Sequence, residues 1–175
     1  MGPSRIVRWA SAFAYGSRMA HARRLRFILC LAAMLPTICL AAPASAPSPD
    51  LSAVQVVQLQ LRALQHNDVP HADAGIALVY AFTTPRNRAQ TGPLSRFSNM
   101  IHRGYAGLLD HQSATLAPAR IDGDRALQGV ELIDHAGSVR EYVFLLSRMH
   151  APPYAECWMV DGVVERAVPR PSQAL

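Results

Sequence analysis

Two arginines, Arg86 and Arg88, lie one residue apart, just before the segment Thr91-Gly92-Pro93. A proline in such a segment is typical of the first turn of a helix, where backbone N–H groups such as that of Gly92 remain free. Two guanidinium groups beside a helix N-terminus could hold a carboxylate or a phosphate ester. The alternative, which we favour for at least one of the arginines, is that their side chains bind loop carbonyls in a joint between two helices.

Four further side chains could act as acid or base, three of them where the predicted helices meet the predicted strands and one on a strand. His102 and Asp110 are the first pair to consider for proton abstraction, and Tyr105 lies between them in the chain. Glu141 falls in an otherwise apolar register of a predicted strand, where a buried carboxylate would indicate a functional role. Each of these groups can equally lie on the surface, so catalysis is the alternative interpretation and not the leading one.

The segment from His66 to Asp73 places two histidines and two aspartates close together, the other two being Asp68 and His71. These are metal-ligand types, but their spacing follows no metal-binding motif and Pro70 separates the histidines. Ordinary turn and helix-capping chemistry explains the same residues. We therefore predict no metal site, and we predict no cofactor.

Cysteine chemistry is limited as well. Cys30 and Cys39 fall in an N-terminal segment that we expect to be removed, which leaves Cys157 without a partner for an internal disulfide. Cys157 adjoins Trp158 in a predicted strand, and we interpret it as a small core residue rather than a nucleophile. The sequence contains neither a serine-nucleophile motif nor a dinucleotide-binding glycine motif.

Charge is divided unevenly along the 175 residues, whose formal net charge is +5. Six arginines and no acidic residue precede Asp50, whereas eleven arginines and twelve acidic residues lie from Asp50 onward. The basic character therefore belongs to the N-terminus, and the body of the chain is close to neutral. We expect no nucleic-acid partner, because nucleic-acid binding requires a basic surface on the folded domain.

Residues 1–42 have the pattern of a signal peptide, with arginines, an apolar core from Phe27 to Ala42, and small residues after it. Met19 is an alternative start, and residues 43–50 form a Pro/Ala/Ser linker. We predict export to the periplasm or out of the cell. Two alternatives stay open: an uncleaved segment that anchors the chain in a membrane, and an organellar transit peptide. Such an anchor would be the chain's only membrane contact.

Three short helices are predicted after the linker. The first follows Ser52, with Val54, Val57, Leu61 and Leu64 on one apolar face and the glutamines on the others. The second runs from about His71 to Phe82 and is ended by Pro85. The third has Pro93 at its first position and ends at Gly104, and the side chains that we expect to face inward are Leu94, Phe97 and Ile101.

From His111 onward the apolar residues alternate, which predicts strands. The turn Asp122-Gly123-Asp124 separates two strands, and a turn at Ala136-Gly137 precedes the apolar stretch SVREYVFLLSRM. Residues 51–168 are thus expected to form one α+β domain, with helices on one face of a curved antiparallel sheet of about four strands. Residues 169–175 are expected to be a disordered tail.

This order of elements, with the segments VVQLQLRALQHND, PLSRFSNMIHRGY, GVELIDHAGSVREYVFLLSR and CWMVDG, resembles the bacterial domain of unknown function family 4864. The family is similar in layout to the cone-shaped superfamily that includes nuclear transport factor 2 and to the cystatin-like folds. The resemblance implies an α+β cone. It implies no established activity and no catalytic residues, because one fold can carry many functions.

The leading functional hypothesis is an exported, non-catalytic domain that binds a small apolar or acidic ligand, or a partner protein. One rival is a small cofactor-independent isomerase or dehydratase that uses His, Asp and Tyr groups at the mouth of a pocket. Another is a module that forms a homodimer through its sheet, because both registers of the strand Val139 to Leu146 are apolar.

Overall fold

The computed structural model of the protein describes residues 46–166. The predicted signal segment, the alternative start at Met19 and the predicted tail at 169–175 all lie outside the described residues. At the end of the predicted linker, Ser48 and Asp50 form a turn: the hydroxyl of Ser48 bonds the Asp50 carboxylate, and the N–H of Leu51 donates to the Ser48 carbonyl. This turn leads directly into the first helix.

Helix α1 (Ala53–Gln65) begins with a capping box, in which Ser52 and Gln55 each bond the other's backbone N–H. The prediction that the glutamines lie outside the apolar face of this helix was wrong for Gln60, which is completely buried. The buried side chains of the helix recur at helical spacing around its inward side, namely Ala53, Val56, Val57, Leu59, Gln60, Leu61 and Leu64. The helix is buried this widely because it packs on both the sheet and α2.

Three short helices follow α1, so the domain has four helices where the sequence predicted three. Helix α2 (Ala74–Ala81) ends at Phe82, and α3 (Pro85–Thr91) begins with Pro85 itself, capped by the Thr84 side chain. The prediction that Pro85 only ends a helix was wrong, because a proline fits the first helical position, where its missing N–H has no helical partner.

Helix α4 (Leu94–Gly104) is the predicted third helix, with Pro93 as its N-cap, and a 3-10 turn η1 (Ala106–Leu108) follows it. Phe97 and Ile101 face inward as predicted, whereas Leu94 does not, since 39% of its surface is exposed. Leu94 occupies the first position of the helix, beyond the buried residues Phe97 and Ile101.

The chain then forms five antiparallel strands: β1 (Ser113–Leu116), β2 (Arg120–Asp122), β3 (Arg125–Ile133), β4 (Val139–Arg148) and β5 (Trp158–Arg166). The strand order is β1-β3-β4-β5, and β2 pairs with the other end of β3. The hairpin predicted at Asp122-Gly123-Asp124 is the β2–β3 connection. A bulge interrupts the β4–β5 pairing, because Leu145 pairs with Gly162 while Leu146 pairs with Val160, which leaves Asp161 as the extra residue.

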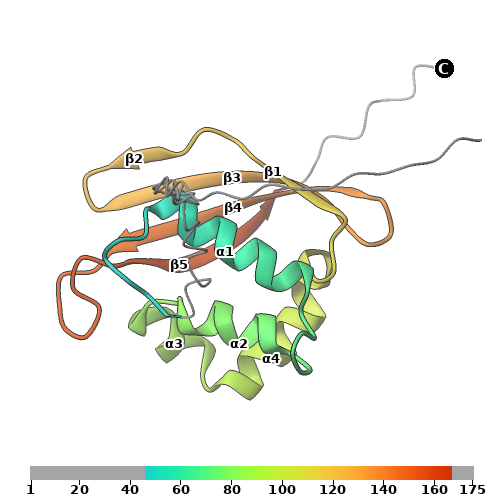
Figure 1. Ribbon diagram of the computed structural model, residues 1–175, viewed down its shortest axis with the longest axis horizontal. Helices are drawn as coiled ribbons and strands as arrows, with labels where there is room; N and C mark the ends of the chain where they lie inside the picture. The colour runs from blue at the N-terminus through green and yellow to red at the C-terminus, as the bar shows by residue number, and fades with distance from the viewer. Residues whose placement is uncertain (1–45, 167–175) are drawn as a thin grey trace, which may run out of the picture. The chain divides into compact units, whose positions relative to one another are not determined.

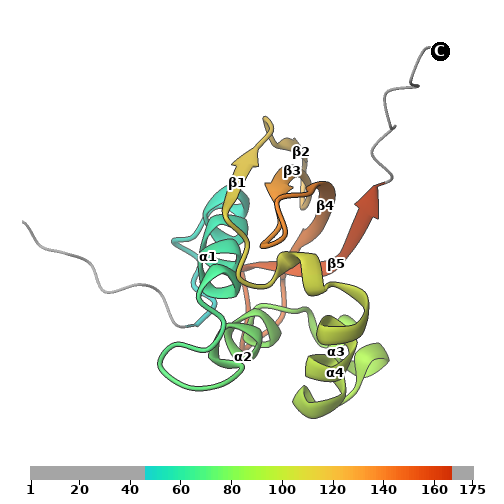
Figure 2. The same ribbon diagram turned by 90° about the vertical axis from the view of Figure 1, so that its right-hand side faces the viewer.

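The helices cover one face of the sheet, so the predicted α+β class and the curved antiparallel sheet are confirmed. Helix α1 lies along the sheet, and α2, α3 and α4 form a group beside α1 and β5 (Figure 1; Figure 2 shows the same arrangement from the side). The covered face of β4 carries Tyr142, Phe144 and Leu146, all of them buried. Within residues 46–166, no helix has the length and apolar character needed to cross a membrane.

The opposite face of the sheet carries Glu141 in the register that the alternation predicts. On this outer face Glu141 lies directly across from Glu131 on β3 and from Arg166 on β5. The apolar side chains of this face are partly exposed, and the most exposed are Leu127, Val139 and Val164. Glu141 therefore lies away from the interior between helices and sheet.

Candidate functional site

A mostly apolar cavity of about 150 Å³ lies between the helices and the covered face of the sheet. We call it the helix–sheet cavity. Its buried walls come from the helices and from the sheet, namely Gln60, Leu64, Val79, Thr83, Phe97, Ile101, Leu108, Phe144 and Val160. Its rim consists of half-buried residues, namely Asn87, Thr91, Met100, Tyr105, Asp161, Gly162 and Val163. Half-buried rim residues give small molecules a route into the cavity.

Gln60 is the one polar side chain of the buried wall that lacks partners within residues 46–166. None of its surface is exposed, and neither Nε2 nor Oε1 of its amide has a hydrogen-bond partner. Thr83, the other polar wall residue, donates its hydroxyl to the Tyr80 carbonyl at 2.7 Å. Most buried polar groups in native proteins are paired, so an amide with two unpaired atoms beside a cavity indicates a ligand or water position.

Gln60 is positioned by helical spacing alone. It lies three residues after Val57 and four before Leu64, which places it in the middle of the buried stripe of α1. This spacing is the signal that could have identified it in the sequence, because a residue at i+3 and i−4 from two core positions shares their face.

Two ionisable groups stand at the rim of the cavity, and both are held by the chain. Asp161 is the bulge residue of β5, and its carboxylate accepts a hydrogen bond from the Ser147 hydroxyl. Tyr105, a predicted acid–base candidate, donates its hydroxyl to the Val163 carbonyl at 3.0 Å. The cavity thus has a mostly apolar wall, and its rim carries one carboxylate and one phenol.

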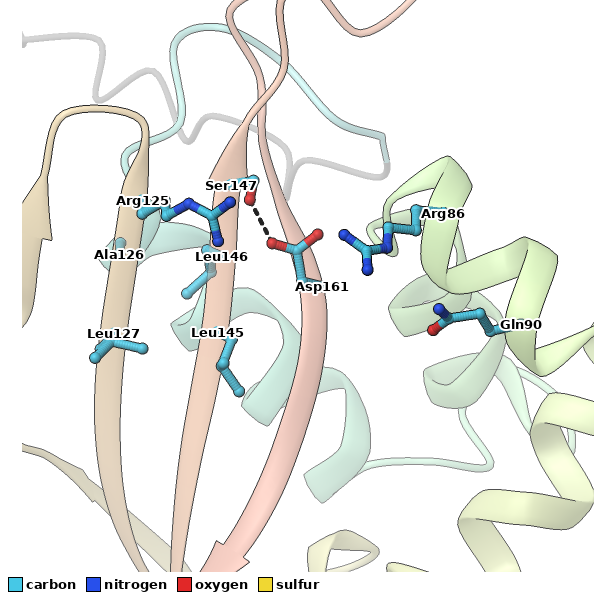
Figure 3. A pocket seen from close by; sticks show the side chains of 9 residues that line it. All are labelled: Arg86, Gln90, Arg125, Ala126, Leu127, Leu145, Leu146, Ser147 and Asp161. Atoms are coloured by element: carbon cyan, nitrogen blue, oxygen red, sulfur yellow. Dashed lines mark hydrogen bonds between the residues drawn. The ribbon is translucent and has the colours of Figure 1, made fainter.

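A second groove, of about 290 Å³ and lined by both polar and apolar residues, shares Asp161 with the cavity. Figure 3 shows the Arg86 side chain extending from α3 toward Asp161, with Gln90 beside it and Arg125 across the strands. Both arginines are exposed. Arg86, predicted as half of an anion site, therefore faces a groove that already contains a carboxylate.

Arg88, the other predicted anion ligand, turns back onto the chain. Its guanidinium donates to the Ala81 carbonyl at 2.7 Å, to the Tyr154 hydroxyl at 3.1 Å and to the Thr83 hydroxyl at 3.3 Å. It also lies 5.3 Å from the ring centre of Tyr80 and 5.5 Å from that of Tyr154. These bonds fasten α3 to the end of α2 and to the loop before β5.

Gly92 does not offer the free N–H that the sequence predicted. Its N–H donates to the Arg88 carbonyl at 2.9 Å, which closes the last turn of α3, and its own carbonyl accepts from the Tyr80 hydroxyl. Its φ of 82° lies in the left-handed region that glycine favours, so it is the C-cap of α3. The structure therefore does not bring Arg86, Arg88 and Gly92 together around one position.

His102, expected to pair with Asp110, instead pairs with Asp73. Its Nε2 lies 2.9 Å from Asp73 Oδ1, and the Ser98 hydroxyl bonds the other oxygen of the same carboxylate. The hydrogen bonds from Ser98 and Asn67, with a smaller contribution from His102, lower the pKa of Asp73 below its usual value. Asp110 is exposed and donates its backbone N–H to the Leu64 carbonyl.

The residues between His66 and Asp73 form a turn held by Asn67. The Asn67 amide bonds the carboxylates of both Asp68 and Asp73, and Asp68 also accepts from the Asp73 backbone N–H. His71 bonds the neighbouring Ala72 carbonyl. In residues 46–166 no three His, Cys, Asp or Glu side chains are grouped so that they could hold a metal ion.

Two further titratable groups are buried away from the cavity. Burial raises the pKa of the Cys157 thiol, which suits a core residue more than a nucleophile. Burial also raises the pKa of Tyr142 to about 12. Its neighbour Arg140 bridges Asp134 and Glu165, each at 2.8 Å, so this cluster ties the β3–β4 turn to β5.

The family model described as Domain of unknown function (DUF4864) matches residues 48–173, which is more than half of the chain. The chain belongs to this family. No curated protein and no solved structure matches it. The part of the chain that matches DUF4864 includes Gln60, Asp161 and every other residue of the helix–sheet cavity. The cavity therefore lies within the residues that the family model matches and not in the N-terminal segment.

Proposed function

We propose that this protein binds a compact, largely apolar small molecule in the helix–sheet cavity and does not transform it. The observation that carries the proposal is the Gln60 amide, which is fully buried in the cavity wall with both polar atoms unpaired. A buried donor or acceptor without a partner costs about 1–3 kcal/mol of stability. A ligand that bonds this amide removes that cost, so binding and folding favour each other.

The size of the cavity sets the size of the ligand. A cavity of about 150 Å³ that is lined by Leu, Ile and Phe side chains can hold a molecule of the size of benzene. The wall here has the same apolar character, apart from Gln60 and Thr83. The ligand is therefore a molecule of roughly six to nine non-hydrogen atoms, unless part of it extends past the rim.

The positions of the ionisable groups favour binding over catalysis. General acid–base chemistry needs a titratable group within hydrogen-bond reach of the reacting proton. His102 and Asp110 do not line the cavity, and Glu141 lies on the outer face of the sheet. The two ionisable rim groups, Asp161 and Tyr105, already bond the chain. An isomerase or dehydratase at this site would have to use those two groups.

Two coarser hypotheses accompany this proposal. Export is supported by the basic and apolar pattern of residues 1–42, and N-terminal sequencing of the protein from its own host tests it, since an uncut N-terminus would contradict it. Kinship with the cone-shaped superfamily of nuclear transport factor 2 is supported by the order of helices and curved antiparallel sheet. Neither hypothesis is required for ligand binding in the cavity.

Native mass spectrometry and thermal unfolding test the proposed function. The protein purified from its host should retain a small molecule, and toluene should raise its Tm. Val163 lies at the rim of the cavity. The larger side chain in Val163→Phe should fill the cavity and abolish both effects. Val164→Phe is the matched control, because Val164 lies on the outer face and is 53% exposed. Absence of any retained mass and of any Tm shift with toluene would overturn the proposal.

A further inference from the structure

The Gln60 amide restricts the polar group of the ligand. Its Nε2 and Oε1 lie on one edge of one planar group, and neither has a partner among residues 46–166. A rotation of the amide by 180° exchanges the two atoms and leaves one donor and one acceptor side by side. A single ligand group satisfies both only if it also presents an acceptor beside a donor. A lactam, a primary carboxamide and a neutral carboxylic acid have such an edge.

A comparison with Gln128 shows that this open edge is specific to Gln60. Gln128 is also buried, but its Nε2 donates to the carbonyls of Ala117 and Gly129, and only its Oε1 lacks a partner. Gln128 does not line the helix–sheet cavity. Burial of a glutamine between sheet and helices therefore does not by itself leave both amide atoms unpaired. In Gln60 both unpaired atoms belong to a residue that lines the cavity.

The charges around the cavity exclude an ionised acid as the ligand's head group. Among residues 46–166, no arginine, lysine or histidine lines it, and the one carboxylate at its rim is Asp161. An anion would lose its hydration without gaining a cation and would face a like charge. Arg86 and Arg125 line the second groove, which also contains Asp161, and Arg88 is bonded to the chain. The expectation of an acidic ligand therefore does not fit this cavity.

We propose that the helix–sheet cavity recognises a neutral cis-amide edge, that of a small lactam or primary carboxamide, through paired hydrogen bonds with Gln60. The inference rests on the proposed function, since it requires a ligand in the cavity. The apolar wall then holds the hydrocarbon part of the ligand, with Phe97, Leu108 and Phe144 as its largest side chains. A ring of five to seven atoms that carries a lactam combines the two requirements within the size of the cavity.

Isothermal titration of the full chain with three probes of matched size tests this inference. The probes are ε-caprolactam, which has the cis-amide edge, cycloheptanone, which keeps the acceptor but lacks the donor, and cyclohexanecarboxylate, which is an anion at pH 7. We expect caprolactam to bind at least about tenfold more tightly than cycloheptanone, because the ketone leaves the Gln60 donor unpaired. Cyclohexanecarboxylate should not bind.

Variants locate the preference at Gln60. Gln60→Leu should lose the preference for caprolactam and bind cycloheptanone as well or better, and Gln60→Met serves the same purpose if the leucine variant does not fold. Gln58→Leu is the control, because Gln58 lies on the same helix and is exposed. If caprolactam and cycloheptanone bind wild type equally, or if the preference survives in Gln60→Leu, the head-group inference fails and ligand binding stands. If no probe binds and toluene produces no Tm shift, the proposed function fails as well.

Discussion

Arg88 and Gln60 are opposite cases of a polar side chain inside this domain. The Arg88 guanidinium donates to three oxygens of the chain and lies against two tyrosine rings. The Gln60 amide, in contrast, bonds no atom of the described chain, although none of its surface is exposed. The charged residue that looks like a ligand site is part of the framework, and the neutral residue that looks like helix surface lines the cavity.

The difference follows from the strength of the two groups as hydrogen-bond partners. A guanidinium cannot be buried without partners, so any fold that draws Arg88 toward the interior must supply carbonyls and hydroxyls for it. A neutral amide costs less to bury, so a fold can tolerate one that is unpaired until a ligand arrives. For this chain, the unpaired neutral group is therefore better evidence of a site than the paired charge.

The largest expected effect comes from removing the Arg88 side chain, which tests its structural role. Arg88→Ala should lower the free energy of unfolding by about 3 kcal/mol, because it removes charge-assisted hydrogen bonds and leaves the Ala81 carbonyl and the Tyr154 hydroxyl without their donor. Urea unfolding at pH 7 measures the loss. Arg86→Ala, two residues earlier on α3, is the control and should stay within about 0.5 kcal/mol of wild type. Equal losses in the two variants would contradict the framework role.

The second effect compares the two buried glutamines, and the sign of the change distinguishes them. Without ligand, Gln60→Leu should raise the free energy of unfolding by about 1 kcal/mol, because two unpaired polar atoms leave the core. Gln128→Leu should lower it by about 1–2 kcal/mol, because the carbonyls of Ala117 and Gly129 lose their donor. Urea unfolding of ligand-free protein measures both. Destabilisation by both substitutions would mean that Gln60 has a partner in the ligand-free protein.

The third effect extends the comparison to the β3–β4 turn, where groups of the chain itself donate hydrogen bonds to the Asp134 carboxylate. Asp134 accepts from Arg140 and from the N–H groups of Ser138 and Ala136, and the bond from Arg140 contributes most to holding its pKa below the usual 3.8. A lowered pKa in the folded state means that the ionised carboxylate adds stability above about pH 4, which is lost as the pH falls through the folded pKa.

Asp134→Asn should therefore lower the Tm at pH 7, and the difference from wild type should shrink as the pH is lowered from 5 toward 3. Thermal unfolding over that range measures it. His135→Asn is a suitable control, because His135 is exposed in the same turn and its side chain does not bond the Asp134 carboxylate. A difference from wild type that is constant over this pH range would exclude the ionised carboxylate as its cause.

The smallest effect concerns the exposed pair His102–Asp73. Both side chains are partly exposed, 47% for His102 and 37% for Asp73, so solvent screens their interaction. His102→Ala should change the free energy of unfolding by only about 0.5 kcal/mol and leave caprolactam binding unchanged. Denaturant unfolding and calorimetric titration of the same sample measure the two quantities. A loss of binding in this variant would bring His102 back as a functional residue.

The spacing of apolar residues and the residue types of turns predict most of the fold from the sequence. These rules fail where one residue can take two roles. The hairpin at Asp122-Gly123-Asp124 and the inward side of α4 follow from local rules. Pro85 can end one helix or begin another. The hydrogen bond from the Asn87 N–H to the Thr84 hydroxyl, which is seen only in the structure, favours the second role. The cavity was not predictable in the same way, because it depends on how α1, α4 and β5 pack in space.

For the site, sequence reasoning identified Tyr105 near the mouth and missed Gln60 and Asp161. Gln60 was assigned to the surface because its residue type outweighed its spacing, although Val57 and Leu64 place it on the buried face. Asp161 depends on a bulge, and a bulge appears only when the register of two strands is known.

The bulge at Asp161 also determines which residue of β5 closes the cavity. With the extra residue in place, Phe144 pairs with Val163 and Val143 pairs with Val164. If Asp161 paired regularly with Leu145 instead of forming the bulge, Gly162 would lie opposite Phe144 and Val163 would turn to the outer face. Loss of the bulge without loss of the residue would thus exchange a valine for a glycine in the cavity wall. An irregularity in one strand therefore sets the shape of the cavity wall without any substitution inside the cavity.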